Sequence, residues 1–155
     1  MSRAFVKEDS DAPEPPPLER PVSAAPNRVT PRGLRLIGEE VARIEAALAA
    51  GPDAGAEALL RRDLRYWTKR RASAQPVAPD PAPIMAGFGA RVTIRRGGRT
   101  RKIEIVGEDE ADPGSGRIAW TSPLARALDG AEPGETVELG SETVDVLAVA
   151  PGGEG

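Results

Sequence analysis

Apolar residues recur at steps of three and four positions in two stretches of residues 28–75, and this spacing predicts two amphipathic helices. Thr30-Pro31 is a favourable helix start, and Gly51-Pro52 ends the first helix because a residue that precedes proline disfavours helical backbone. We therefore expect an antiparallel helical hairpin, a coiled coil with arms of about 20 residues that are roughly 30 Å long. The two seams consist of Leu34, Ile37, Val41, Ile44 and Leu48, and of Leu60, Leu64, Trp67 and Ala74.

From residue 87 onward the apolar period changes to two, which predicts strands. Gly97-Gly98 supplies a hairpin turn, and Ser122-Pro123 begins one short helix that ends at Gly130. The pattern predicts an α+β protein in which the helical hairpin is followed by a small antiparallel β domain with one short helix. The strands are expected over residues 90–94, 103–105, 118–120, 137–139 and 144–149.

Proline-rich segments divide the chain. Residues 1–27 contain Pro13, Pro15, Pro16, Pro17, Pro21 and Pro26 and few large apolar side chains, so we expect a disordered or extended tail. Residues 76–86 are expected to be a linker between the hairpin (28–75) and the C-terminal domain (87–150), and residues 151–155 a flexible tail.

The chain contains no cysteine and no histidine, which removes disulfides, the common zinc sites, and Ser-His or Cys-His nucleophilic catalysis. Any catalysis would have to use carboxylates, Lys, Ser or a metal ion borrowed from elsewhere; we expect no catalytic residues, no metal site and no cofactor of its own. No apolar stretch is long enough to cross a bilayer, and residues 1–9 lack the apolar core of a signal peptide. These features predict a cytoplasmic protein, and we expect it to be a monomer.

Charge is unevenly distributed along the chain. The net charge is −2 for residues 1–27, +4 for residues 28–75 and −5 for residues 76–155. A basic face is expected on the second helix, and it has two interpretations: a solvated surface, or a contact with a phosphate backbone or an acidic protein channel. We expect no aromatic stacking platform there, and so no sequence-specific readout of bases. The face consists of Arg61, Arg62, Arg65, Lys69 and Arg70, with Arg71 beside them.

Two acidic groups have plain structural interpretations. The run Glu108-Asp109-Glu110-Ala111-Asp112 by itself indicates a charged loop, without the ligand spacing of a calcium loop. At the hairpin tip, Asp53 is expected to cap the second helix and Glu57 to favour its first turn. Both interpretations leave these residues without chemistry of their own.

Several motifs occur in the order found in the C-terminal domain of Gre-type transcription elongation factors, which this chain resembles over residues 28–150. The motifs are residues 88–90 (FGA), 105–112 (IVGEDEAD), 116–118 (GRI), 122–128 (SPLARAL) and 134–137 (GETV), with 30–34 (TPRGL) at the hairpin start. The resemblance implies an FKBP-like C-terminal fold that docks on bacterial RNA polymerase beside its secondary channel. The docking residues that it implies are Glu108, Asp109, Glu110, Asp112, Trp120, Thr121, Ser122, Pro123 and Arg126. This requires that the corner of residues 120–128 is not buried against the hairpin.

The chain departs from the family at the hairpin tip. Gre factors that stimulate transcript cleavage carry a Gly-Asp-x-x-Glu-Asn type motif there, which helps to hold a second Mg²⁺ in the polymerase active site. This hairpin is shorter, and Asp53 and Glu57 are spaced differently; each lost helical turn withdraws the tip by about 5 Å. The expected function is therefore a regulator, not an enzyme, that binds core polymerase at the secondary channel without efficient cleavage stimulation, with RNA or DNA backbone nearby.

Three alternatives stay open. Asp53 or Glu57 could reach the polymerase Mg²⁺ and stimulate cleavage. The domain could instead be an adaptor for a different protein. The weakest alternative is a peptidyl-prolyl isomerase, for which only Phe88 and Trp120 would supply aromatic walls to a proline pocket.

Overall fold

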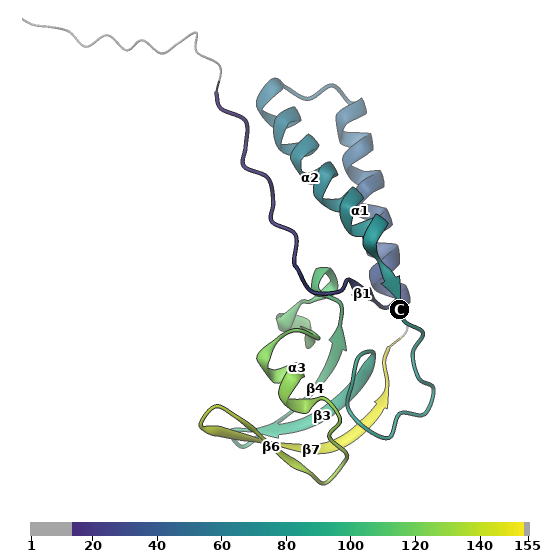
Figure 1. Cartoon of the computed structure of the whole chain (residues 1–155), viewed down its shortest axis with the longest axis vertical. Coiled ribbons are helices and arrows are strands. Elements are labelled where there is room, and N and C mark those ends of the chain that lie inside the picture. The colour runs from purple at the N-terminus through teal and green to yellow at the C-terminus, as the bar shows by residue number, and fades with distance from the viewer. Residues whose placement is uncertain (1–13, 154–155) are drawn as a thin grey trace, which may run out of the picture.

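The computed structural model describes residues 14–153 and shows a helical hairpin standing on a small sheet domain (Figure 1). Residues 1–13 and 154–155, which belong to the two expected tails, lie outside the described residues. The chain is a mixed α+β protein, as the hydrophobic periods predict. Over the described range, no helix is long and apolar enough to cross a membrane.

The hairpin consists of α1 (Pro31–Ala49) and α2 (Ala54–Ser73). Both expected caps are confirmed: the Thr30 side chain accepts a hydrogen bond from the Gly33 amide, and Asp53 accepts one from the Ala56 amide at 2.8 Å. These bonds satisfy amide groups that have no partner inside a helix.

The seam of α1 is close to the prediction. Its buried apolar side chains are Ile37, Val41 and Ile44, while Leu48 is half-buried. The prediction that Leu34 belongs to the seam is wrong, since 36% of this residue is exposed and Gly33 occupies the buried position instead. In α2, the one fully buried residue is Arg70, not an apolar residue of the expected seam. The fully buried side chains of the hairpin are therefore apolar in α1, whereas the one in α2 is charged and lies near the end of that helix.

The C-terminal domain is a five-stranded sheet in the order β5-β4-β3-β7-β6. Its strands are β3 (Ala90–Arg96), β4 (Arg99–Val106), β5 (Arg117–Ala119), β6 (Thr136–Leu139) and β7 (Glu142–Pro151). The expected purely antiparallel sheet is wrong in one pair, because β5 runs parallel to β4. Two parallel strands require a connection in which the chain crosses back before the second strand begins. Between β4 and β5 this connection contains two short 3₁₀ helices, η1 (Glu108–Glu110) and η2 (Pro113–Ser115).

The core of this domain lies between the sheet and α3 (Pro123–Leu128), which lies against one face of it (Figure 1). It is aliphatic, as the low aromatic content predicts, and its fully buried side chains come from alternate strand positions. They include Val92, Ile94, Ile103, Ile105, Leu128, Val144 and Val146. This core holds η1, β5 and α3 in fixed positions near the base of the hairpin.

A two-stranded joint connects the hairpin to the rest of the chain. β1 (Arg28–Val29) precedes α1, β2 (Gln75–Pro76) follows α2, and the two strands pair in parallel. Both ends of the hairpin are therefore fixed at one point beside η1. Residues 14–27, for which a disordered or extended tail was expected, are extended and contact α2 through side chains described below.

Candidate functional site

The acidic turn η1 faces the base of the hairpin and not solvent. Glu110 is only 5% exposed. Its carboxylate accepts a hydrogen bond from the Thr30 hydroxyl at 2.6 Å and lies 3.5 Å from the Arg32 guanidinium. At Gly33 an added Cβ would lie 2.8 Å from the Glu110 carboxylate oxygen, so the absence of a side chain there lets α1 approach the turn.

Asp109 makes the second contact with the hairpin. Its carboxylate accepts hydrogen bonds from Arg70 Nε at 2.6 Å and from the Tyr66 hydroxyl. The side chains of Arg70 and Asp109 are 2% and 10% exposed. Asn27 completes the arrangement, because its side chain accepts a bond from Arg70 Nη2 and donates one to the Arg70 carbonyl, each at 2.8 Å. Each buried charge therefore has an opposite charge and further hydrogen bonds.

Tyr66 is held as a neutral donor in this group. Burial, followed by the hydrogen bond to Asp109 and the charge of that carboxylate, raises the pKa of Tyr66 to about 12. The phenol therefore remains protonated at neutral pH and donates to Asp109. We refer to Thr30, Asn27, Tyr66, Arg70, Asp109 and Glu110 as the clasp.

Glu108, the remaining acidic residue of η1, connects this turn to the corner formed by residues 120–128. Glu108 accepts a hydrogen bond from the Thr121 hydroxyl at 3.0 Å. The Arg28 guanidinium lies over the Trp120 ring, 4.8 Å from its centroid. Gly107 permits this approach, since an added Cβ would lie 2.4 Å from the Arg28 carbonyl oxygen.

The structure thus separates the predicted docking residues into two groups. Glu108, Asp109 and Glu110 bond within the chain, and Asp109 and Glu110 bond to the base of the hairpin, so docking through these two would require their contacts with the hairpin to open; their docking role stays a prediction. The exposed residues are Asp112, Pro123 and Arg126, while Trp120, Thr121 and Ser122 are half-buried.

The corner formed by residues 120–128 is not covered by the two helices of the hairpin. Ser122 caps α3 by accepting a hydrogen bond from the Ala125 amide at 3.3 Å, and Pro123 occupies the first helical position, as predicted. Figure 1 shows α3 below the base of the hairpin and not beside its shaft. Phe88 and Trp120 line a pocket on this side of the domain together with Arg28, Ile105, Ala125 and Arg126.

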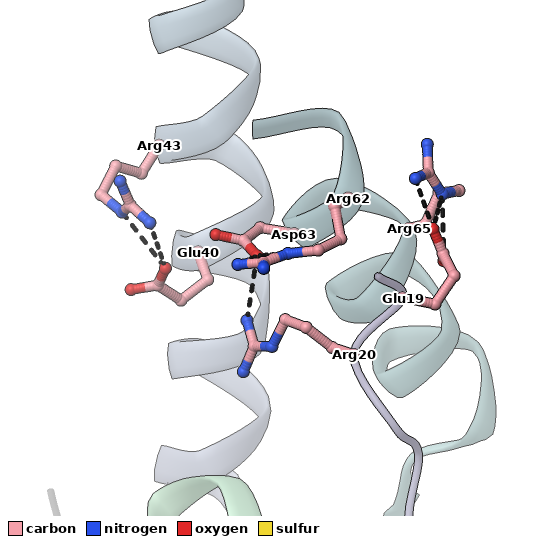
Figure 2. A network of polar contacts seen from close by, with 7 residues as sticks. All are labelled: Glu19, Arg20, Glu40, Arg43, Arg62, Asp63 and Arg65. Carbon is pink, nitrogen blue, oxygen red and sulfur yellow. Dashed lines mark hydrogen bonds and ion pairs between the residues drawn. The ribbon is translucent and has the colours of Figure 1, made fainter. Parts of the chain in front are cut away.

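The basic residues of α2 are mostly paired within the chain. Arg61 lies 2.9 Å from Glu57. Figure 2 shows two further pairs: Arg62 lies 2.8 Å from Asp63, and Arg65 pairs with Glu19. Arg70 does not belong to the exposed face that was expected, because Asp109 draws it into the clasp. Lys69 is exposed.

Sequence reasoning missed the aromatic pair on this helix. Tyr66 and Trp67 follow Arg65 directly and precede Lys69, and their rings are in edge contact with centroids 5.1 Å apart. Aromatic residues therefore do interleave with the basic ones on α2, whereas the expected absence of a base-stacking platform stays a prediction. The sequence carries the signal as the tetrad Arg65-Tyr66-Trp67-Thr68, of which only Trp67 fits the apolar seam.

The hairpin tip has the structure that capping predicts. Asp53 is engaged as the N-cap, and Glu57 bonds to Arg61 Nε at 2.9 Å. Among residues 14–153, no group of three Asp or Glu side chains is placed to hold a metal ion.

The comparisons with known proteins point to the C-terminal domain. A family profile described as the C-terminal domain of the transcription elongation factors GreA and GreB matches residues 84–151. Transcription elongation factor GreB of Neisseria meningitidis serogroup A is 41% identical over 95 residues, which are 57% of this chain and 58% of that protein. GreA of Nitrobacter winogradskyi is 48% identical over 68 residues, 43% of this chain and 37% of that protein.

The match thus spans little more than half of the length of the Neisseria GreB relative and little more than a third of that of the Nitrobacter GreA relative. Among solved structures, GreA factor homolog 1 of Thermus thermophilus is 17% identical, with 79% of this chain and 97% of that chain covered and a TM-score of 0.38.

Proposed function

We propose, from the premise that this chain belongs to the GreA/GreB family through its C-terminal domain, that the protein is a bacterial transcription elongation factor that binds RNA polymerase at its secondary channel. The observation that carries the proposal is the match of residues 84–151 to the family's C-terminal domain. In this domain the corner around α3 is left open by the hairpin, which is what a docking surface needs.

The docking surface that we propose is centred on Pro123 and Arg126, with Asp112 at its edge. All three are exposed: Pro123 and Arg126 belong to α3, which packs against the core, and Asp112 directly precedes η2. A surface held this rigidly can bind a partner without a cost for ordering its backbone. The clasp residues contribute indirectly, because they fix the direction of the hairpin relative to this surface.

We further propose that the factor does not stimulate transcript cleavage efficiently. A tip carboxylate that holds a metal ion must be free, whereas Asp53 is engaged as a helix cap and Glu57 is paired with Arg61. Moving either one to a metal would break these contacts. The protein would then regulate elongation by occupying the channel entrance.

Binding of core polymerase by variants of the corner tests the docking proposal. We expect Arg126→Glu to weaken retention of core polymerase on the immobilised protein at least about tenfold, as loss of a central interface contact does. Arg95→Glu is the matched control, because Arg95 is also exposed but lies on β3. Equal binding by both variants would contradict docking through α3, and recovery of a different protein would favour an adaptor.

A backtracked elongation complex tests the second proposal. We expect no acceleration of RNA cleavage by the parent protein, and no change in Asp53→Asn or Glu57→Gln. Acceleration that disappears in these variants would establish the cleavage-stimulating alternative. A peptide isomerisation assay separates the third alternative, since Phe88 and Trp120 do share a pocket.

A further inference from the structure

Residues 14–27 form an extended strap along α2 (Figure 1), and Glu19 carries its main anionic contact. The Glu19 carboxylate accepts a hydrogen bond from Arg65 Nε at 2.8 Å. This bond lowers the pKa of Glu19, and the nearby charges of Arg65, Lys69 and Arg62 lower it further. Glu19 therefore places one negative charge among three positive charges of the helix.

Arg20, the next residue, covers the aromatic pair. Its guanidinium carbon lies 3.9 Å from the centroid of the Tyr66 ring and 5.6 Å from that of Trp67. Figure 2 shows Glu19 turned toward Arg65 while Arg20 reaches the Arg62–Asp63 pair, 3.5 Å from the Asp63 carboxylate. The flat guanidinium therefore occupies the face of Tyr66.

The surface under these two residues combines cations with aromatic faces. Single-stranded nucleic acids are bound by this combination, because cations attract the phosphates and aromatic rings stack on the bases. Glu19 offers an anion to the cations, and Arg20 offers a planar group to the ring. The strap thus presents the two chemical features of a nucleotide to the face formed by Arg62, Arg65, Tyr66, Trp67 and Lys69.

We propose that this face of α2 binds single-stranded nucleic acid, and that Glu19-Arg20 is a built-in competitor that the nucleic acid displaces. The contacts suit a reversible cover, because the side chains of Arg65 and Glu19 are 51% and 52% exposed and water screens their attraction. Nucleic acid fits better than an acidic protein surface, which would leave the aromatic faces unused. The inference goes beyond polymerase docking and does not depend on it.

Fluorescence anisotropy with a labelled single-stranded RNA of about 12 nucleotides at low salt tests the competitor, since binding to phosphates weakens steeply with salt. We expect Glu19→Gln to bind about two- to fivefold tighter than the parent chain, which is the effect of releasing one exposed ion pair. Glu14→Gln is the matched control, because it removes the same charge from the same strap at an exposed position. Lys69→Gln in the Glu19→Gln background should cancel the gain.

Arg20→Gln tests the stacking half of the proposal. Losing a positive charge alone weakens binding to a polyanion, yet uncovering Tyr66 should make this variant bind RNA tighter than Arg95→Gln, which loses the same charge away from the strap. Far-UV circular dichroism confirms that each variant is folded. Equal affinity of Glu19→Gln and Glu14→Gln would overturn the proposal, as would Arg20→Gln binding no better than Arg95→Gln. Competition by polyglutamate as strong as by RNA of equal charge would overturn the assignment to nucleic acid.

Discussion

Replacing Asp109 by Asn tests whether the clasp holds the hairpin on the C-terminal domain. Asp109 and Arg70 form an ion pair whose side chains are 10% and 2% exposed. The substitution preserves the size of the side chain but removes its charge, so the Arg70 guanidinium remains buried without an opposite charge. Removing one partner of a buried ion pair costs about 3–5 kcal/mol, and the retained hydrogen bonds place this case near 3 kcal/mol.

Urea denaturation followed by circular dichroism measures this loss. We expect the free energy of unfolding to fall by about 3 kcal/mol, which is a large part of the 5–15 kcal/mol typical of a folded domain. The melting temperature should fall by about 6–12 °C, since each kcal/mol corresponds to about 2–4 °C in a chain of this size. Asp112→Asn, an exposed carboxylate of the same acidic run, should change stability by less than about 0.5 kcal/mol.

A double variant separates the ion pair from general disruption. Arg70→Met with Asp109→Leu replaces both charges by apolar groups, so it should recover a large part of the stability that Asp109→Asn loses. If Asp109→Asn lost less than about 1 kcal/mol and resembled Asp112→Asn, the clasp would not be formed as described. Asp109 would then be available to an external partner.

Further outcomes are expected at Gly107, Tyr66 and Asp53. Gly107→Ala should destabilise the protein by about 1–3 kcal/mol in urea, because its Cβ would lie 2.4 Å from a backbone carbonyl oxygen, whereas Gly38→Ala in the open part of α1 should stabilise it by about 0.4–1 kcal/mol. Tyr66 is the one tyrosine of the chain, so its absorbance titration should have a midpoint near pH 12, and Asp109→Asn should lower it. Because the pKa of Tyr66 is raised from 10.0 to about 12 on folding, its contribution to stability is complete below pH 10 and should be lost as the pH rises through 12; a Tyr66→Phe variant without this loss is the control. Asp53→Ala should cost about 1 kcal/mol through the lost cap, and a neutral result would show that the first turn of α2 is frayed.

Local features were predictable from the sequence because their causes are local. Thr30, Asp53 and Ser122 cap the helices that they were expected to cap, since the interacting amide lies three residues away. The apolar periods located both helices and the five strands of the sheet. The low aromatic content correctly indicated an aliphatic core.

Features that depend on distant partners were not predictable in this way. The burial of Arg70 depends on Asp109, 39 residues away, and that of Glu110 depends on Thr30, 80 residues away. A run of acidic residues carries no local sign of whether it faces solvent or a basic partner. The same limit explains why the parallel pairing of β5 and the contact between residues 14–27 and α2 appear only in the structure.

The two-stranded joint also makes the length of the hairpin independent of its direction, because the direction is fixed at the base. The clasp uses residues near the first turn of α1 and the last two turns of α2, while the remainder of both helices makes no contribution to it. Seven residues inserted into each helix would move the tip outward by about 10 Å along an unchanged axis. The length of the hairpin can therefore be changed by inserting or deleting helical turns near its tip, while the contacts at its base stay the same.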